Sequence, residues 1–220
     1  MVNTILLSVK DPVHSKQRLA SILSPLERKK LVWAMLKDVS SAIAKCHLVH
    51  RIVIVAHDPE IIQYAYEKRW EVLSEKKQIS ENKSVDWASE VLAEEGVTDV
   101  LRLPIDIPLV QAQDLDDLFK ETPTSPYALL VPSLDGLGTN ALRRSPPNVF
   151  PSKFGSDSFR KHMKEARRLN VTVKVKNMPR IALDIDKLSD LKLFLTKGHG
   201  TKTEEVIRKV RTLERFFSRG

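Results

Sequence analysis

Short apolar runs, each followed by a pattern typical of a helix, recur along the first two thirds of the chain. Five runs are largely uncharged, as expected for strands that are buried on both faces of a sheet. They span residues 4–9, 51–56, 71–73, 99–103 and 127–131. We expect a strand over each of them.

The segments between these runs show the three- and four-residue spacing of amphipathic helices. Ser24-Pro25-Leu26-Glu27 is a capping box with proline at the first helical position, which predicts a helix from there to residue 45. A second helix is expected after Asp58-Pro59, and Ser84 is expected to cap a helix over 85–95 that Gly96 ends. Further helices are predicted over 112–120, from 159, over 187–195 and over 203–218.

Strands that alternate with helices of this length predict a mostly parallel central sheet with helices on both faces, an α/β fold. With 220 residues, of which 42% are hydrophobic, the chain can form one sizeable core. We therefore expect one domain over residues 1–200, to which residues 201–220 are appended as a basic helix.

The charge of the chain favours an anionic partner, because 36 Lys and Arg against 28 Asp and Glu give a net charge of +8. Nucleic acid, a nucleoside triphosphate and a phosphorylated metabolite are all candidates. Residues 187–220 hold nine Lys and Arg against four Asp and Glu, but no aromatic residues alternate with these charges for base stacking. A solvated helix face is the favoured interpretation of this tail, and we expect no nucleic acid partner.

No apolar run approaches the roughly 20 residues of a membrane span, and the first residues resemble a strand and not a signal peptide. We therefore expect a cytoplasmic protein without membrane contact. One cysteine and six scattered histidines exclude a disulfide framework and a zinc cluster. Whether the protein forms a homodimer stays open.

The segment 131–159 gathers small, turn-forming and cationic residues in a span too irregular for one helix or strand, as in an active-site loop. Residues 135–140 supply two glycines, a hydroxyl and an amide, so the backbone can approach an anion and donate N–H groups to it. Arg143 and Arg144 are expected to add positive charge there. A second turn at 154–158 precedes a helix start, which suits a phosphate or a carboxylate. Two ordinary surface turns joined by a Pro-Pro linker are the alternative.

Carboxylates mark two other places where extended segments end. Asp106 stands between prolines after the fourth predicted strand, while Asp184 and Asp186 share one face of an extended segment because side chains alternate there. Each acid alone could form a turn or cap a helix. Together with a glycine-rich anion site they indicate a metal-assisted phosphate reaction, in which the carboxylates hold Mg²⁺.

Three cations, Lys10, Lys16 and Arg18, follow the first predicted strand in a loop that suits a triphosphate. We expect them to be exposed and to contribute little to stability. A solvated loop without a ligand is the alternative.

Six groups of residues together resemble the CofC family of guanylyltransferases that act in coenzyme F420 biosynthesis. They are VK with SKQRL (9–10 and 15–19), LSPLER with AMLKDV (23–39), LPIDIPLV (103–110), DGLGTNAL (135–142), FGSDSFRKH (154–162) and LDID (183–186). The match runs from residue 5 to residue 195. DGLGTNAL followed at this distance by FGxxSF is more specific than any single motif.

The resemblance implies a Rossmann-like, three-layer nucleotidyltransferase fold similar to that of MobA, and transfer of GMP from GTP to a small phosphorylated acid with release of pyrophosphate. In the family that acid is 2-phospho-L-lactate, phosphoenolpyruvate or 3-phosphoglycerate. The roles implied for single residues are metal binding by Asp106 and by one or both of Asp184 and Asp186, and catalysis by Lys16 and Asp106. Acceptor binding is implied for Thr139, Asn140, Gly155 and Ser158, and nucleotide binding for Lys10, Lys16 and Arg18.

One part of the chain departs from the family pattern. Many relatives have a Leu-Asn pair at the start of the helix that faces the base, whereas this chain has Ser84-Val85-Asp86, so Ser84 and Asp86 are our candidates for nucleotide binding. Two other functions remain. A protein of the same fold could use another nucleotide or acceptor, and a basic nucleic-acid-binding module would explain the charge but leave the acids without a purpose.

Overall fold

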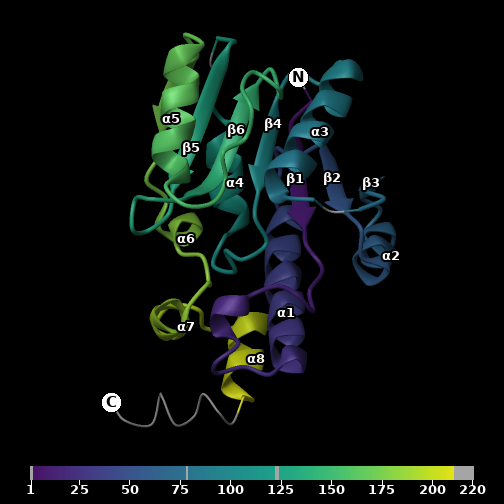
Figure 1. Ribbon diagram of the computed structural model, residues 1–220, viewed down its shortest axis with the longest axis vertical. Coiled ribbons are helices and arrows are strands. Elements are labelled where there is room, and N and C mark those ends of the chain that lie inside the picture. Colours follow the sequence, from purple (N-terminus) through teal and green to yellow (C-terminus); the bar gives the residue numbers. More distant parts are fainter. Residues whose placement is uncertain (1, 78, 122–123, 211–220) are drawn as a thin grey trace.

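The computed structural model describes residues 2–77, 79–121 and 124–210. Within these residues the centre of the molecule is a seven-stranded sheet with the order β3-β2-β1-β4-β6-β5-β7 (Figure 1). The strands are β1 (Thr4–Val9), β2 (Arg51–Ala56), β3 (Glu71–Ser74), β4 (Val100–Leu103), β5 (Tyr127–Pro132), β6 (Thr139–Ser145) and β7 (Thr172–Val175). The five predicted strands are all present, and β6 and β7 are additional.

The sheet is mostly parallel, as predicted, but β6 is antiparallel to both of its neighbours, β4 and β5. The prediction that the segment 131–159 is an active-site loop is therefore wrong for residues 139–145, which form a strand that is buried along its whole length. The reversal matters for the site. Because β6 runs against β4 and β5, it begins at the edge of the sheet where these two strands end, and its first residues lie near the last residues of β4.

Arg143 and Arg144 are buried within β6 and do not line an anion site, contrary to the prediction. The Arg143 guanidinium donates to both carboxylate oxygens of Asp99, at 2.8 and 2.7 Å. Arg144 donates to the Phe150 carbonyl oxygen and to the Ser89 hydroxyl. Both guanidinium groups thus satisfy buried acceptors and hold β6 in place, because a buried charge needs such partners.

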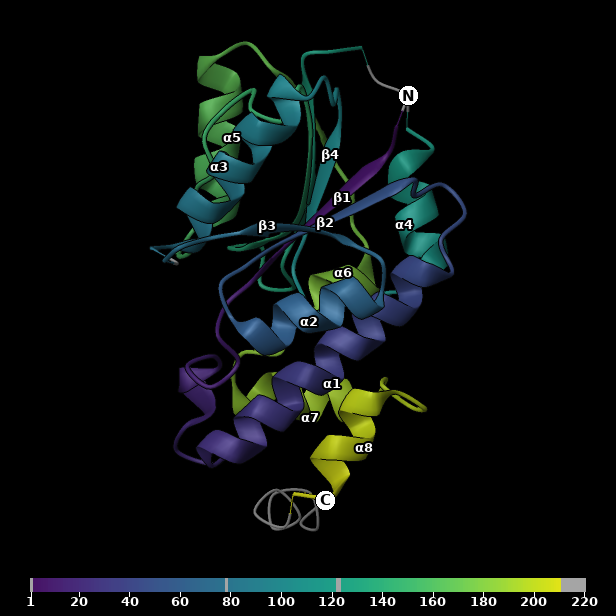
Figure 2. The same ribbon diagram turned by 90° about the vertical axis from the view of Figure 1, so that its right-hand side faces the viewer.

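Helices cover both faces of the sheet, as predicted (Figure 2). They are α1 (Pro25–Ala44), α2 (Pro59–Glu67), α3 (Glu81–Glu94), α4 (Ala112–Phe119), α5 (Ser158–Arg168), α6 (Pro179–Ala182), α7 (Leu188–Leu195) and α8 (Lys202–Arg208). The side chains of β1 alternate between the two faces. Ile5 and Leu7 pack in the core with α1, α2 and α4, while Leu6 packs in the core with α3.

Helix capping follows the sequence in two of three cases. The capping box at Ser24 and the cap at Asp58 are both formed. Helix α3, however, begins at Glu81 and is capped by Ser80, so the prediction that Ser84 caps this helix is wrong. Ser84 lies one turn inside the helix and is fully buried.

A second core lies below the sheet, where α7 and α8 pack beside the lower part of α1 (Figure 1). It is formed by apolar residues such as Leu31, Met35, Phe194 and Ile207. Asp38 of α1 accepts hydrogen bonds from the first two backbone N–H groups of α8, at 2.9 and 2.8 Å. Of the predicted helix 203–218, residues 211–218 lie outside the described residues. No described helix has both the length and the apolar composition that a membrane crossing requires.

Candidate active site

A cavity of about 890 Å³ lies at the edge of the sheet where β1 and β4 end. Its walls come from the loop after β1, the loop after β4, the start of β6, the start of α5 and the segment before α7. This is the edge at which parallel α/β sheets bind ligands. Of the candidate residues, the cavity is lined by Lys10, Lys16, Arg18, Asp106, Thr139, Asn140, Gly155, Ser158, Asp184 and Asp186.

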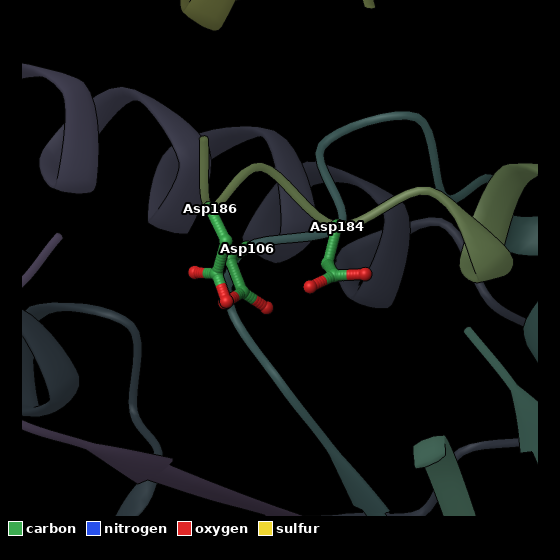
Figure 3. A group of neighbouring side chains, drawn as sticks. All are labelled: Asp106, Asp184 and Asp186. Atoms are coloured by element: carbon green, nitrogen blue, oxygen red, sulfur yellow. The ribbon is translucent and has the colours of Figure 1, made fainter. Parts of the chain in front are cut away.

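Asp106, Asp184 and Asp186 form one cluster, in which a carboxylate oxygen of each lies within 4.8 Å of the others (Figure 3). The Ile185 N–H donates to the Asp106 carbonyl oxygen at 2.9 Å, which ties the two acidic segments together. Leu183 and Ile185 are buried, while Asp184 and Asp186 reach the cavity, as the alternation along this segment predicts. Three carboxylates that converge from two segments are a suitable set of hard oxygen ligands for Mg²⁺.

The ammonium group of Lys16 lies between two carboxylates of this cluster. Its ammonium nitrogen lies 2.6 Å from Asp106 Oδ2 and 2.6 Å from Asp186 Oδ1, and only 8% of its side chain is exposed. The prediction that Lys16 is an exposed loop cation is therefore wrong, although Arg18 is 77% exposed as predicted. Lys16 adopts a left-handed backbone conformation (φ 55°) just before a short 3₁₀ helix, Gln17–Leu19, and this turn carries its side chain back over the acids.

The charges of this cluster shift its pKa values in opposite directions. Burial lowers the pKa of Lys16, but Asp106 and Asp186 outweigh burial and raise that pKa above its ordinary value. Burial raises the pKa of Asp106, but the Lys16 ammonium holds that pKa below its usual range. For Asp184, burial and the charge of Asp106 raise the pKa to about 6. Two carboxylates thus share one ammonium, and Asp184 is the member whose charge is least compensated.

The candidate acceptor residues line the opposite wall. Gly155 has a φ of 110°, a conformation that side chains with a Cβ rarely adopt, so glycine is required at this turn. Ser158 is the first residue of α5, where backbone N–H groups of the first turn have no partner within the helix. The side chain of Asp157 makes no capping bond to these groups. Such a helix start suits an anionic group.

Thr139 and Asn140, the first two residues of β6, connect this wall to the acids. The Thr139 hydroxyl lies 3.0 Å from Nδ1 of His162 in α5. The Asn140 amide donates at 2.9 Å to Asp184 Oδ1 and to the carbonyl oxygens of Ile181 and Ala182. The register between β5 and β6 shifts at these two residues, and through them β6 contacts two different walls of the cavity.

Ser84 and Asp86, our candidates for nucleotide binding, do not line this cavity. The Ser84 hydroxyl oxygen lies 2.9 Å from Glu75 Oε2 and 3.0 Å from the Ser80 carbonyl oxygen, and Asp86 accepts a hydrogen bond from the Ser152 N–H at 2.8 Å. The reason is the earlier start of α3, which places Ser84 inside the helix. At this end of the cavity the structure has Glu81 instead.

The cavity or wall residues that were not recognised in the sequence include Ser8, Glu81, Arg102 and His162. Arg102 forms an ion pair with Glu81, and its guanidinium lies 4.0 Å from the centre of the Phe154 ring. A single cation in the apolar run 99–103 was a usable signal for Arg102. His162 stood in the FGSDSFRKH group, but nothing in the sequence indicates that its ring is buried against Thr139.

Comparison with known proteins agrees with this geometry. The family model described as "Guanylyl transferase CofC like" matches residues 3–218, beyond the 5–195 expected from the motifs. The chain is 34% identical to 2-phospho-L-lactate guanylyltransferase of Methanothermobacter thermautotrophicus, over 90% of this chain and 86% of the relative. It is 32% identical to phosphoenolpyruvate guanylyltransferase of Rubrobacter xylanophilus, over 86% and 92%.

Among solved structures, a candidate nucleotide-diphospho-sugar transferase from Desulfovibrio desulfuricans G20 superposes with a TM-score of 0.78 at 18% identity, over 99% of both chains. A likeness at this identity concerns the fold alone, and the fold is that of a nucleotidyltransferase. The family model, which covers nearly the whole chain, identifies the enzyme class as well. The chain belongs to the CofC-like guanylyl transferase family.

Proposed function

We propose that the protein transfers the GMP group of GTP to the phosphate of a small phosphorylated carboxylic acid and releases pyrophosphate. An oxygen of the acceptor phosphate forms the new bond to the α-phosphorus of GTP, and the bond between that phosphorus and the β-phosphate breaks. The main observation in support of the proposal is that the acid cluster, Lys16 and the Gly155–Ser158 turn line one cavity. The names of the relatives support GTP as the donor.

Asp106, Asp184 and Asp186 would hold Mg²⁺, since they offer three carboxylate oxygens within 4.8 Å of one another. The ion would neutralise phosphate oxygens and polarise the bond to the leaving pyrophosphate. Lys16 also neutralises charge at this place, and Lys10 and Arg18 add further cations on the same side of the cavity. Positioning and electrostatic stabilisation account for most of the catalysis in phosphoryl-type transfers.

On the other wall, Thr139, Gly155 and Ser158 would hold the carboxylate or phosphate of the acceptor, with Asn140 keeping this wall in register with Asp184. The start of α5, where the Asp157 side chain makes no capping bond, supports this assignment. The acceptor is 2-phospho-L-lactate, phosphoenolpyruvate or 3-phosphoglycerate, three-carbon acids of which the first two carry the phosphate on C2 and the third on C3. A role in coenzyme F420 biosynthesis and a cytoplasmic location follow from the same proposal.

The test is a direct one. The purified protein is incubated with GTP, MgCl₂ and each of the three phosphoacids, and the GMP adduct is detected by mass spectrometry with pyrophosphate measured in parallel. We expect an adduct with at least one acceptor, and none when EDTA replaces MgCl₂. Absence of adduct and of pyrophosphate with all three acceptors would contradict the proposal.

Thermal shifts with GTP, ATP, CTP and UTP in the presence of MgCl₂ address the choice of nucleotide. A ligand at 100 times its Kd stabilises a folded protein by about 2.7 kcal/mol, enough for a clear shift. We expect GTP to give the largest shift. A larger shift with another nucleotide would favour a relative of the same fold with different specificity.

A further inference from the structure

His162 of α5 is fully buried, yet both of its ring nitrogens have polar partners. The Lys153 backbone N–H donates to Nε2 at 2.9 Å, and Nδ1 lies 3.0 Å from the Thr139 hydroxyl oxygen. The ring packs near the rings of Phe150 and Phe154. The imidazole therefore stands between the apolar core under α5 and a residue that lines the cavity.

The Lys153 contact fixes the tautomer of the ring. A backbone N–H can only donate, so Nε2 must accept and carries no proton. In a neutral imidazole the proton is then on Nδ1, and Nδ1 donates to the Thr139 oxygen. The ring is neutral because burial, with the charges of Arg144, Arg102 and Lys153, lowers the pKa of His162 to about 3.

The direction of this bond decides what Thr139 can offer a ligand. A hydroxyl has one proton and can accept hydrogen bonds through its oxygen. Since the Thr139 oxygen accepts from His162, the hydroxyl proton is left for another partner, and Thr139 lines the cavity. Carboxylate and phosphate oxygens only accept hydrogen bonds, so a hydroxyl that is held as a donor suits them.

We propose that His162 is a positioning residue for the acceptor substrate: its Nδ1–H holds the Thr139 hydroxyl as a hydrogen-bond donor towards the acid groups of the phosphoacid. This inference rests on the proposed function, because it needs an acid in this part of the cavity. A residue that only filled the core would need neither of the two polar contacts. The contact with Lys153 serves the same end, since it fixes the tautomer and lies two residues before Gly155.

The test is a double-mutant cycle of His162→Leu and Thr139→Val, with the Michaelis constants for GTP and for the acceptor measured separately. The acceptor used is whichever of 2-phospho-L-lactate, phosphoenolpyruvate and 3-phosphoglycerate the parent protein converts. We expect His162→Leu to raise the acceptor constant about 3- to 10-fold, the worth of one ordinary hydrogen bond, and to change the GTP constant less than about twofold. In the Thr139→Val background the same change should add less than about twofold, because the hydroxyl on which His162 acts is gone.

Two further variants separate positioning from packing. His162→Asn keeps an N–H donor near the place of Nδ1 and should recover part of the acceptor affinity. Phe150→Leu disturbs the same core without touching Thr139, so it should lower stability and leave both constants near those of the parent. Equal effects of His162→Leu in both Thr139 backgrounds, or equal effects on both substrates, would overturn the proposal.

A measurement without substrate keeps the inference distinct from the proposed function. The ¹⁵N chemical shifts of the His162 ring in the parent protein should report a proton on Nδ1, an unprotonated Nε2 and no titration between pH 5 and pH 8. A proton on Nε2 would overturn the inference even if the enzyme transfers GMP. Failure to transfer GMP to any of the three acids, with the expected tautomer present, would instead contradict the proposed function.

Discussion

Asp106→Asn is the substitution that separates the metal role of the acid cluster from its role in folding. Asparagine keeps the size of the side chain and an oxygen that can accept from Lys16. The backbone contact between the Ile185 N–H and the Asp106 carbonyl oxygen does not depend on the side chain. The variant therefore removes one negative charge and leaves the packing of the loop after β4 in place.

The electrostatic cost of this change can be worked out from the distances. At an effective dielectric constant of 20, loss of the Lys16 contact at 2.6 Å removes about 6 kcal/mol of attraction. The two other carboxylates lie within 4.8 Å, so loss of repulsion returns about 3 kcal/mol from each when both are charged. The two effects nearly cancel, and Lys16 keeps Asp186 as a partner. We therefore expect the free energy of unfolding to change by less than about 1 kcal/mol, as for a typical surface substitution.

Catalysis would have no such compensation, because the proposed Mg²⁺ would lose one of three charged ligands. We expect kcat/KM to fall at least about 100-fold, the usual effect of removing one group that stabilises transition-state charge. The assay is pyrophosphate release at a series of MgCl₂ concentrations, with urea denaturation followed in parallel. Asp117→Asn on α4 is the matched control, since it removes one surface carboxylate that pairs with Lys120. A folded Asp106→Asn protein with near-normal turnover would remove Asp106 from the metal site.

Three other changes test single contacts. Lys16→Met should raise the Michaelis constant for GTP and also lower the melting temperature, because this buried ammonium bridges two carboxylates. GTP kinetics and thermal denaturation measure the two effects. An unchanged melting temperature would contradict the bridge. Asn140→Asp puts a carboxylate against Asp184 and two carbonyl oxygens, and should cost about 3 kcal/mol of unfolding free energy in urea. Asn148→Asp, at an exposed asparagine, should cost less than about 1 kcal/mol, and equal costs would contradict the role of burial. His162 is protonated below about pH 6.5 in the unfolded chain but only near pH 3 in the folded protein, because the fold lowers its pKa to about 3. The free energy of unfolding should therefore fall by about 1 kcal/mol between pH 7 and pH 5.5. The variant His162→Leu should not show this loss.

The sequence predicted those parts of the fold that local patterns determine. The five apolar runs became strands, and the capping signals at Ser24 and Asp58 begin helices where expected. The acid cluster was also predictable, because the carboxyl ends of parallel strands meet at one edge and side chains alternate in the extended segment 183–186. These predictions need only the spacing of residues within a short window.

Strand β6 could not be predicted in this way, since the partners that make it a buried strand are distant in the sequence. Arg143 and Arg144 were predicted to add positive charge to an anion site, and only the fold brings them to Asp99 and Ser89. The start of α3 shows the same limit on a smaller scale. Ser80 and Ser84 are equally good caps by residue type, and burial of Ser84 in the core decides between them.

The antiparallel direction of β6 explains how one cavity contains both the acid cluster and the proposed acceptor-binding residues. In an all-parallel sheet, only the last residues of the strands and the loops after them reach the edge where the cavity lies. Here the loops after β1 and β4 supply Lys16 and Asp106. Because β6 runs the other way, its first residues, Thr139 and Asn140, arrive at the same edge as ordered strand residues and not as loop residues. The register between β5 and β6 shifts at this place, and Thr139 contacts His162 of α5 while Asn140 contacts Asp184. The distance between the proposed acceptor wall and the acids is thus set by one peptide unit of a buried strand, which is a more rigid connection than a loop could provide.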